Sequence, residues 1–254
     1  MLPIPADIKE VATILLIFGR FSGVMAAAPV LSNRHLPARI KIAFSLLVGF
    51  ALAPLYRTAE IPTNASALAL AMVGEVLIGL AIGFVAGLAF MAVHVAGEMA
   101  DVSIGFTMAT QYNPALGVHA PVLTQLQTTL AALLFLGMDG HHTVLTATAD
   151  SINLLPLGSV LPASSALRCV DLVAGLFSVG VRMALPTVAS LVIADAALAL
   201  LARTAPQINL FTVGVPVKMG VGLLVVMIGL PVLVSLTAET LHAVGRQIAF
   251  LVAR

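Results

Sequence analysis

Six apolar segments, three of them longer than one membrane crossing requires, most constrain what this chain can fold into. The segments are Val11–Leu31, Ile42–Tyr56, Ala65–Val95, Pro121–Met138, Val170–Ala202 and Leu210–Leu241. A helix crosses the roughly 30 Å of bilayer hydrocarbon with roughly 20 apolar residues, whereas a helix through all of Ala65–Asp101 would be roughly 55 Å long. The chain is therefore predicted to be an all-α, polytopic membrane protein of long, kinked helices. Kinks are expected at the prolines within or beside the segments, which are Pro29, Pro54, Pro186, Pro216 and Pro231.

Charged residues are too scarce to cover a water-soluble fold. Lys and Arg (12) together with Asp and Glu (11) make up 9% of the chain, and apolar residues make up 60%. Soluble domains average about 25% charged residues, so a soluble enzyme is excluded. The net charge of +1 offers no basic stripe for nucleic acid, and the single cysteine, Cys169, excludes an internal disulfide and a Cys-rich zinc site.

Five charged residues interrupt the apolar segments: Arg20, Glu75, Arg182, Asp195 and Lys218. A charge at the bilayer centre is costly, so such residues usually pair with one another or face water. An ion or proton pathway is the functional interpretation. Interhelical pairing, or a position outside the lipid zone, is the structural interpretation, which we favour. If the last two segments form a hairpin that turns near Ala205–Gln207, Asp195 and Lys218 lie at similar depth, which predicts an ion pair between them.

A glycine stripe runs through the third segment. Gly79, Gly83 and Gly87 recur every four residues, a pattern that lets helix backbones approach closely. Farther along the same face lie Met91, His94, Glu98 and Asp101. One end of this helix is therefore expected to pack closely, and the other to emerge into water or into the polar interior of an assembly.

No residue set suggests catalysis or metal binding. Asp139–Ala166 is rich in turn residues and is expected to lie in water as a loop. His141 and His142 within it are adjacent, and adjacent side chains on a helix point about 100° apart, so we assign them a loop or helix N-terminal role. The sequence contains neither a G-x-S-x-G elbow nor a nucleotide-binding loop. We therefore predict a protein that is not an enzyme and has no cofactor.

Several short motifs, in order, resemble those of the FliR family, which is called SctT in virulence systems. They are Ala28-Pro29-Val30, Leu36-Pro37-Ala38-Arg39, Gly97-Glu98 through Gly105-Phe106-Thr107-Met108 with Asn113-Pro114, Phe135–His142 with Asp150-Ser151, Ala202–Phe211, and Gly214–Lys218. The resemblance extends from about Ile14 to Leu230, and the Gly-His-His triplet with the overall length favours the flagellar branch.

The resemblance implies a subunit of the type III protein export gate in the flagellar basal body of the bacterial inner membrane. Such a subunit closes a helical ring with FliP and FliQ around the export channel, with FlhB at its base and FlhA nearby, and unfolded export substrates pass through. It also implies a FliP-like part over residues 1–168 and a FliQ-like helical hairpin over 169–254.

Two segments acquire specific roles from this resemblance. The family's plug loop corresponds to residues 104–121, with candidate gate residues Gly105, Phe106, Met108, Tyr112, Asn113, Pro114 and Gly117. The alternative is a surface loop that only helps assembly. The turn at the FliQ-type hairpin tip, with Arg203, Pro206, Gln207 and Asn209, is expected to face FlhB or merely to satisfy its own backbone groups.

Other functions remain as alternatives to a flagellar export gate. They are a small-solute transporter or channel that uses Glu75 and the other membrane-level charges, and the virulence-system homologue of the same gate. A transporter should work as a monomer or homo-oligomer, whereas a gate subunit should be stable only with FliP and FliQ. An intramembrane enzyme would need a catalytic dyad that the sequence does not display.

Overall fold

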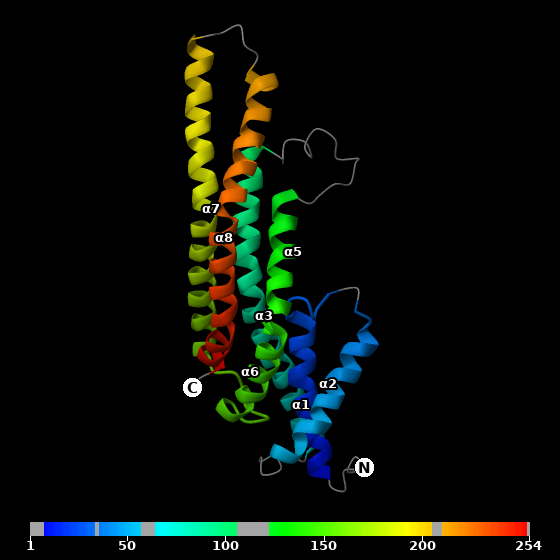
Figure 1. Cartoon of the computed structure of the whole chain (residues 1–254). Coiled ribbons are helices and arrows are strands. Elements are labelled where there is room, and N and C mark those ends of the chain that lie inside the picture. Colours follow the sequence, from blue (N-terminus) through cyan, green and yellow to red (C-terminus); the bar gives the residue numbers. More distant parts are fainter. Residues whose placement is uncertain (1–7, 34–35, 57–63, 106–121, 205–209, 253–254) are drawn as a thin grey trace. The chain divides into compact units, whose positions relative to one another are not determined.

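The computed structural model describes residues 8–33, 36–56, 64–105, 122–204 and 210–252. Within these ranges the chain is helical and contains no strand, so the predicted all-α class is confirmed (Figure 1). The elements are α1 (Ile8–Ala27), α2 (Ala38–Leu52), η1 (Ala53–Tyr56), α3 (Ala65–Ile104), α5 (Val122–Gly137), α6 (Gly140–Leu154), α7 (Ser164–Thr204) and α8 (Leu210–Val252).

Most helices coincide with the predicted apolar segments. By length and composition, five described helices could cross a membrane, or six if the bent pair α5 and α6 forms one span. This agrees with a polytopic membrane protein. The prediction for Asp139–Ala166 was wrong in part, because 140–154 is the helix α6 and not a loop, with His141 and His142 in its first turn. Of the turn residues behind this prediction, Asn153 lies in the last turn of α6, and Pro156, Gly158 and Pro162 follow the helix.

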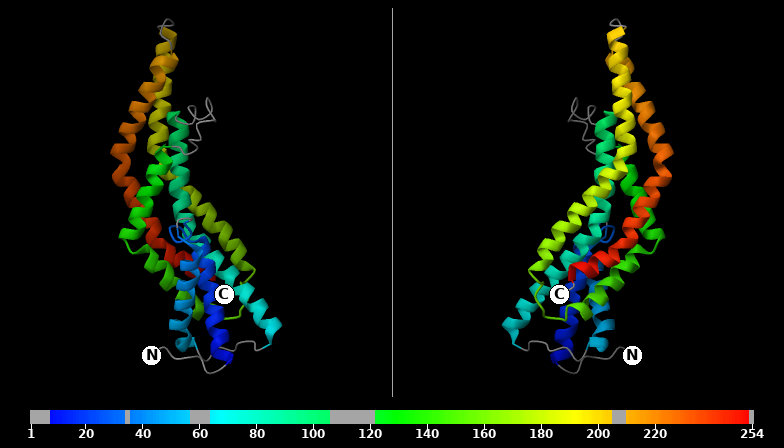
Figure 2. Two further views of the ribbon diagram at one scale, coloured as in Figure 1. Left: turned by 90° about the vertical axis from the view of Figure 1, so that its right-hand side faces the viewer. Right: turned by 90° about the vertical axis from the view of Figure 1, so that its left-hand side faces the viewer.

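The chain divides into two compact units. Unit 1 comprises Met1–Leu88, Asp139–Val173 and His242–Arg254, and unit 2 comprises Ala89–Met138 and Ala174–Leu241. The long helices α3, α7 and α8 each supply residues to both units (Figure 2). These two units are defined by contacts in space. The FliP-like part (1–168) and the FliQ-like part (169–254) were predicted from resemblance to other proteins, so the units do not test that division, and it stays a prediction.

The core of unit 1 forms around α1. Its members Ile14, Leu16, Ile17 and Phe21 pack with Ala53 of η1, Ile152 of α6 and Leu157. Ile14, Ile17 and Phe21 follow the three-and-four spacing of one helical face. Leu16, two residues after Ile14, lies about 200° around the helix from it, so α1 is buried on more than one side.

Two smaller clusters form the core of unit 2. Val93 and Ala96 of α3 pack with Ala131 of α5 and with Met183 and Ala184 of α7. A second cluster joins the end of α3 to the start of α5, the middle of α7 and α8: Ala100, Ile104, Leu123, Leu191 and Val226. The rings of Phe90 and Phe135 meet edge to face, with centroids 5.5 Å apart.

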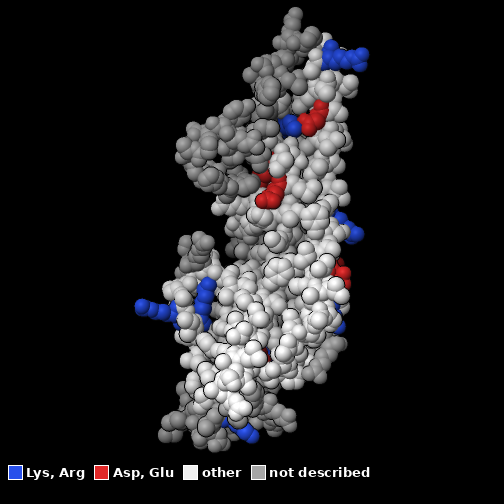
Figure 3. Space-filling view, turned by 180° about the vertical axis from the view of Figure 1, so that it is seen from behind, with Lys and Arg blue, Asp and Glu red and all other residues white. Residues whose placement is uncertain are grey.

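Helices α7 and α8 leave most of their apolar surface uncovered. Only 22% of the most apolar window of α7 and 11% of that of α8 are buried, against 61% for α1. On the face drawn in Figure 3, charged atoms are few and most of the surface is uncharged. Large apolar residues exposed on these two helices include Ile193, Leu200, Leu224, Met227 and Ile228. Such a surface requires lipid or other apolar protein against it.

Candidate functional site

A buried ion pair joins α1 to α3 inside unit 1. The side chains of Arg20 and Glu75 have no exposed surface, and Arg20 Nε lies 2.6 Å from Glu75 Oε2. Arg20 Nη2 donates to Glu75 Oε1 at 3.1 Å, so the pair is bidentate. The bidentate geometry is the one in which an arginine–carboxylate pair is strongest.

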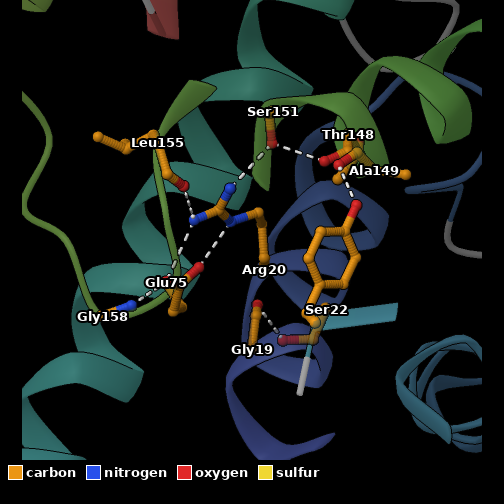
Figure 4. A network of polar contacts seen from close by, with 10 residues as sticks. Gly19, Arg20, Ser22, Glu75, Thr148, Ala149, Ser151, Leu155 and Gly158 are labelled. Atoms are coloured by element: carbon orange, nitrogen blue, oxygen red, sulfur yellow. Dashed lines mark hydrogen bonds and ion pairs between the residues drawn. The ribbon is translucent and has the colours of Figure 1, made fainter. Parts of the chain in front are cut away.

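The remaining polar atoms of this pair are also satisfied (Figure 4). Arg20 Nη1 donates to Ser151 Oγ of α6 at 3.0 Å, and Nη2 donates to the carbonyl of Leu155 at 3.0 Å. The amide of Gly158 donates to Glu75 Oε1 at 2.8 Å. The network therefore ties α1, α3, α6 and the segment after α6 together. The sequence suggested interhelical pairing as one structural role for Arg20 and Glu75, but did not identify them as partners.

The predicted ion pair between α7 and α8 is also present, in unit 2. Lys218 Nζ lies 2.8 Å from Asp195 Oδ1 and 2.9 Å from Oδ2. Of the five charges within the apolar segments, Arg20 and Glu75 are buried, whereas Asp195 is 53% exposed, Lys218 is 23% exposed, and Arg182 is also exposed. These three residues lie on α7 and α8, of whose apolar segments only 22% and 11% are buried.

The glycine stripe of α3 lies against α1. A Cβ added at Gly79 would clash with the carbonyl of Arg20 and lie 3.0 Å from Gly23 Cα, and one at Gly83 would lie 2.8 Å from Ala27 Cβ. Gly87 is less crowded, with its nearest neighbour, Pro29 Cδ, at 4.0 Å. On α1, Gly19 and Gly23 form the matching half of the contact. Their four-residue spacing in the sequence is a signal that could have identified them.

The polar end of the same stripe divides into an exposed pair and a buried cap. His94 Nε2 and Glu98 Oε1 are 3.2 Å apart and both side chains are about half exposed. Asp101, in contrast, is fully buried by its own chain, whereas this end was expected to emerge into water or into the polar interior of an assembly. Its carboxylate accepts hydrogen bonds from the amides of Leu123 (3.1 Å) and Thr124 (2.8 Å) and from Thr124 Oγ1 (2.7 Å).

These bonds make Asp101 the cap of the first turn of α5. The free amides of a helix N-terminus attract a carboxylate, which explains why this charge is buried rather than solvated. Because Asp101 precedes the predicted plug segment 104–121 and Leu123 and Thr124 follow it, one side chain joins the two described ends of that segment. Sequence reasoning missed this role of Asp101.

Most predicted gate and turn residues lie outside the described part of the chain. They are Phe106, Met108, Tyr112, Asn113, Pro114 and Gly117 of the plug segment, and Pro206, Gln207 and Asn209 of the hairpin turn. Gly105 is described and has a φ of 96°, a conformation that favours glycine. Arg203 is exposed in the last turn of α7.

Comparisons with known proteins agree with the motif order in the sequence. Residues 11–244 match the model of a family described as bacterial export proteins, family 1. The flagellar biosynthetic protein FliR of Escherichia coli K12 is 34% identical over 80% of this chain and 78% of its own length. FliR of Bacillus subtilis 168 is 31% identical over 90% of this chain and 92% of its own. The secretion system apparatus protein SsaT of Salmonella typhimurium LT2 is 32% identical over 62% of each chain. This chain, with its long apolar helices and its buried interhelical contacts, therefore belongs to the bacterial export proteins, family 1.

Proposed function

We propose that this chain is a non-enzymatic channel and scaffold subunit of the flagellar type III export gate in the bacterial inner membrane. The observation that carries the proposal is the family match over residues 11–244. The flagellar branch is favoured over the virulence branch because the FliR relatives match 80% and 90% of this chain, whereas SsaT matches 62%. The subunit closes a ring with FliP and FliQ, with FlhB at its base and FlhA nearby.

The uncovered apolar surface supports a scaffold role. Helices α7 and α8, which supply most of the FliQ-like part proposed for residues 169–254, have little buried surface in the chain alone. The FliP-like part proposed for 1–168 contains both the well-covered α1, 61% buried, and the segment Ala38–Tyr56, which is only 17% buried. A ring of subunits would cover the faces that this chain leaves open, because apolar helix faces pack on one another as readily as on lipid.

The ion pair in unit 1 supports a gate subunit over a small-solute transporter. A transporter that uses Glu75 would need that carboxylate to bind or release an ion, yet both of its oxygens accept hydrogen bonds from Arg20. Breaking a buried pair costs several kcal/mol, about 3–5 in measured cases. Glu75 is therefore better suited to holding helices together than to carrying ions.

Within this proposal, segment 104–121 is the plug of the resting channel. Phe106, Met108 and Tyr112 provide bulky side chains that seal a narrow pore against ions, and methionine adapts its shape to varied substrate chains. Gly105, Asn113, Pro114 and Gly117 provide turn residues that let a short segment fold back on itself. Asp101 supports this role because it joins the two described ends of the segment.

Electrical measurements test the plug role. Deleting Gly105–Tyr112 should raise the ion conductance of cells that express the assembled gate, because the seal is lost while the ring remains. Deletion of the hairpin turn, Ala205–Asn209, which lies outside the plug segment, is the control and should leave the conductance low. Unchanged conductance after the first deletion would refute the plug.

The hairpin turn is proposed to face FlhB. Arg203, Pro206, Gln207 and Asn209 bring polar and turn-forming residues to the sequence between two apolar helices. A photo-crosslinker at position 207 should capture FlhB in intact cells, whereas one at the fully buried Ile82 should capture no partner. If position 207 gives no crosslink to FlhB, the polar residues of this turn serve only to form hydrogen bonds with its own backbone.

Copurification tests the whole proposal. The full chain expressed with FliP and FliQ should yield one discrete complex by native mass measurement, and the chain expressed alone should be degraded or aggregate. A stable monomer or homo-oligomer with solute transport in vesicles would instead support the transporter.

A further inference from the structure

A small cavity lies within unit 2, between α5, α7 and α8. Its volume is about 30 Å³. Much of its wall is apolar, with Val226, Leu233 and Leu236 of α8 among the lining residues. Three lining residues bring polar groups: Gln127 of α5, and Arg182 and Thr187 of α7.

Gln127 brings an unpartnered amide to this cavity. Its side chain is only 3% exposed, and Oε1 is buried with no hydrogen-bond partner in the part of the chain that the structure describes. A buried amide left in this way is unfavourable, because it has lost its water and gained nothing in return. Either end of the amide could meet a partner, since one end donates and the other accepts.

Thr187 of α7 lines the same cavity and is 7% exposed. Its hydroxyl can both donate and accept a hydrogen bond there. Two other buried threonines of unit 2 bond within their own helix: Thr237 Oγ1 donates to the Leu233 carbonyl, and Thr240 Oγ1 donates to the Thr237 carbonyl.

Pro186 removes one helical hydrogen bond beside Thr187. Proline has no N–H, so within α7 the carbonyl of Arg182, four residues earlier, receives no hydrogen bond from residue 186. Both Arg182 and Pro186 line the cavity. Helices α5 and α7 therefore both bring polar groups to one small space.

We propose that this cavity is a hydration site, in which one ordered water molecule bridges Gln127 of α5 to Thr187 and to the Arg182 carbonyl of α7. A water molecule needs at least about 10–15 Å³ by this measure and typically makes about three hydrogen bonds. The cavity provides the space, and its lining provides three partners that include both acceptors and donors. The bound water fastens α5 to α7 at the residue where proline interrupts the hydrogen bonds of α7.

Direct observation is the first test. A density map of the assembled complex, at a resolution that shows ordered water, should contain a peak within hydrogen-bond distance of both the Gln127 amide and Thr187 Oγ1. An empty cavity at that resolution, or a direct hydrogen bond between Gln127 and Thr187, overturns the proposal.

A double-mutant cycle is the second test, and it does not depend on a map. Gln127→Met and Thr187→Val preserve side-chain size and remove the polar groups. Each alone should lower the apparent Tm of the purified complex by about 2–4 °C. The double variant should be clearly less destabilised than the sum, because water leaves a site that no longer offers it partners.

Thr240→Val is the matched control. Thr240 is also 7% exposed and lies in unit 2, but its hydroxyl is satisfied within α8. Its effect on Tm should add to that of Gln127→Met without coupling. If the Tm changes of Gln127→Met and Thr187→Val also add without coupling, the proposal that the two residues share a water molecule is overturned.

Discussion

At the residue scale, the Arg20–Glu75 pair places two full charges where neither has any exposed surface. Glu75→Gln would leave the guanidinium of Arg20 buried beside a neutral amide. Removing one partner of a buried pair costs about 3–5 kcal/mol, mainly because the remaining charge stays desolvated. We expect this variant to be strongly depleted from the membrane fraction, as measured by quantitative immunoblot, with loss of swimming in cells that depend on it.

Asp195→Asn provides the control for this prediction. It removes one charge from the Asp195–Lys218 pair, whose members are half exposed and partly exposed. Exposed pairs contribute about 0–1 kcal/mol, so the level of this variant should remain close to that of the unaltered chain. Equal depletion of both variants would show that exposure does not set the cost of losing a charge here.

At the element scale, the contact between α1 and α3 depends on glycine. A methyl group at Gly79 would meet the Arg20 carbonyl oxygen, which is backbone and cannot rotate away. Gly79→Ala should therefore separate the two helices and destabilise unit 1 by about 1–3 kcal/mol. Thermal unfolding of the purified complex measures this as a lower Tm.

Gly175→Ala is the matched substitution in α7. A Cβ at Gly175 would meet nothing within 4 Å, and alanine in a helix is favoured over glycine by about 0.5–1 kcal/mol. Its Tm should be unchanged or slightly higher. A loss of Tm equal to that of Gly79→Ala would argue against close packing as the reason for the stripe.

The start of α5 depends on the Asp101 cap. Asp101→Asn removes the charge and one acceptor, and hydrogen bonds to a charged group contribute about 1.5–3 kcal/mol. Amides in the first turn of α5 should then exchange with deuterium faster, as seen by mass spectrometry of peptides that cover 122–128. Glu98→Gln, one turn earlier on α3 and half exposed, should leave that exchange unchanged. Unchanged exchange in Asp101→Asn would contradict the cap.

The elements themselves differ in how far the sequence reveals them. Long apolar runs revealed α3, α7 and α8 because hydropathy alone decides whether a segment prefers lipid. Helix α6 was missed because its threonines, histidines and aspartate have no apolar periodicity strong enough to stand out from a loop. Depth arithmetic along one hairpin predicted the Asp195–Lys218 contact. Arg20 and Glu75 are 55 residues apart and belong to no single hairpin, so nothing local identifies them as partners.

The site shows the same limit more sharply. Asp101 reads as the exposed end of a polar stripe until α5 is placed against it, and only then does its carboxylate meet two free amides. The sequence likewise gives no sign that Gln127 Oε1 is buried without a partner, or that Gln127 and Thr187 line one cavity. Sequence patterns identify which face of a helix is polar. The partner of a buried polar group, however, depends on how the helices pack in the tertiary structure.

At the scale of the whole molecule, the exposed apolar residues of α8 distinguish a lone membrane bundle from one part of a larger ring. Ile228 is 78% exposed in the chain alone. In a lone bundle its side chain would contact lipid, whereas in a ring at least part of α8 would contact a neighbouring subunit. The chain has one cysteine, so Cys169→Ser gives a cysteine-free background in which Ile228→Cys can carry a spin label.

Oxygen dissolves in lipid tails, so its collisions with that label report lipid contact. We expect the oxygen accessibility of the label at position 228 to be high in the isolated chain in nanodiscs and to fall when FliP and FliQ are present, because a subunit replaces lipid at this face. A label at Ile82, which is fully buried by its own chain, should be inaccessible in both samples. High accessibility at 228 in the assembled complex would place this face of α8 against lipid, and the ring contact would then have to use another face.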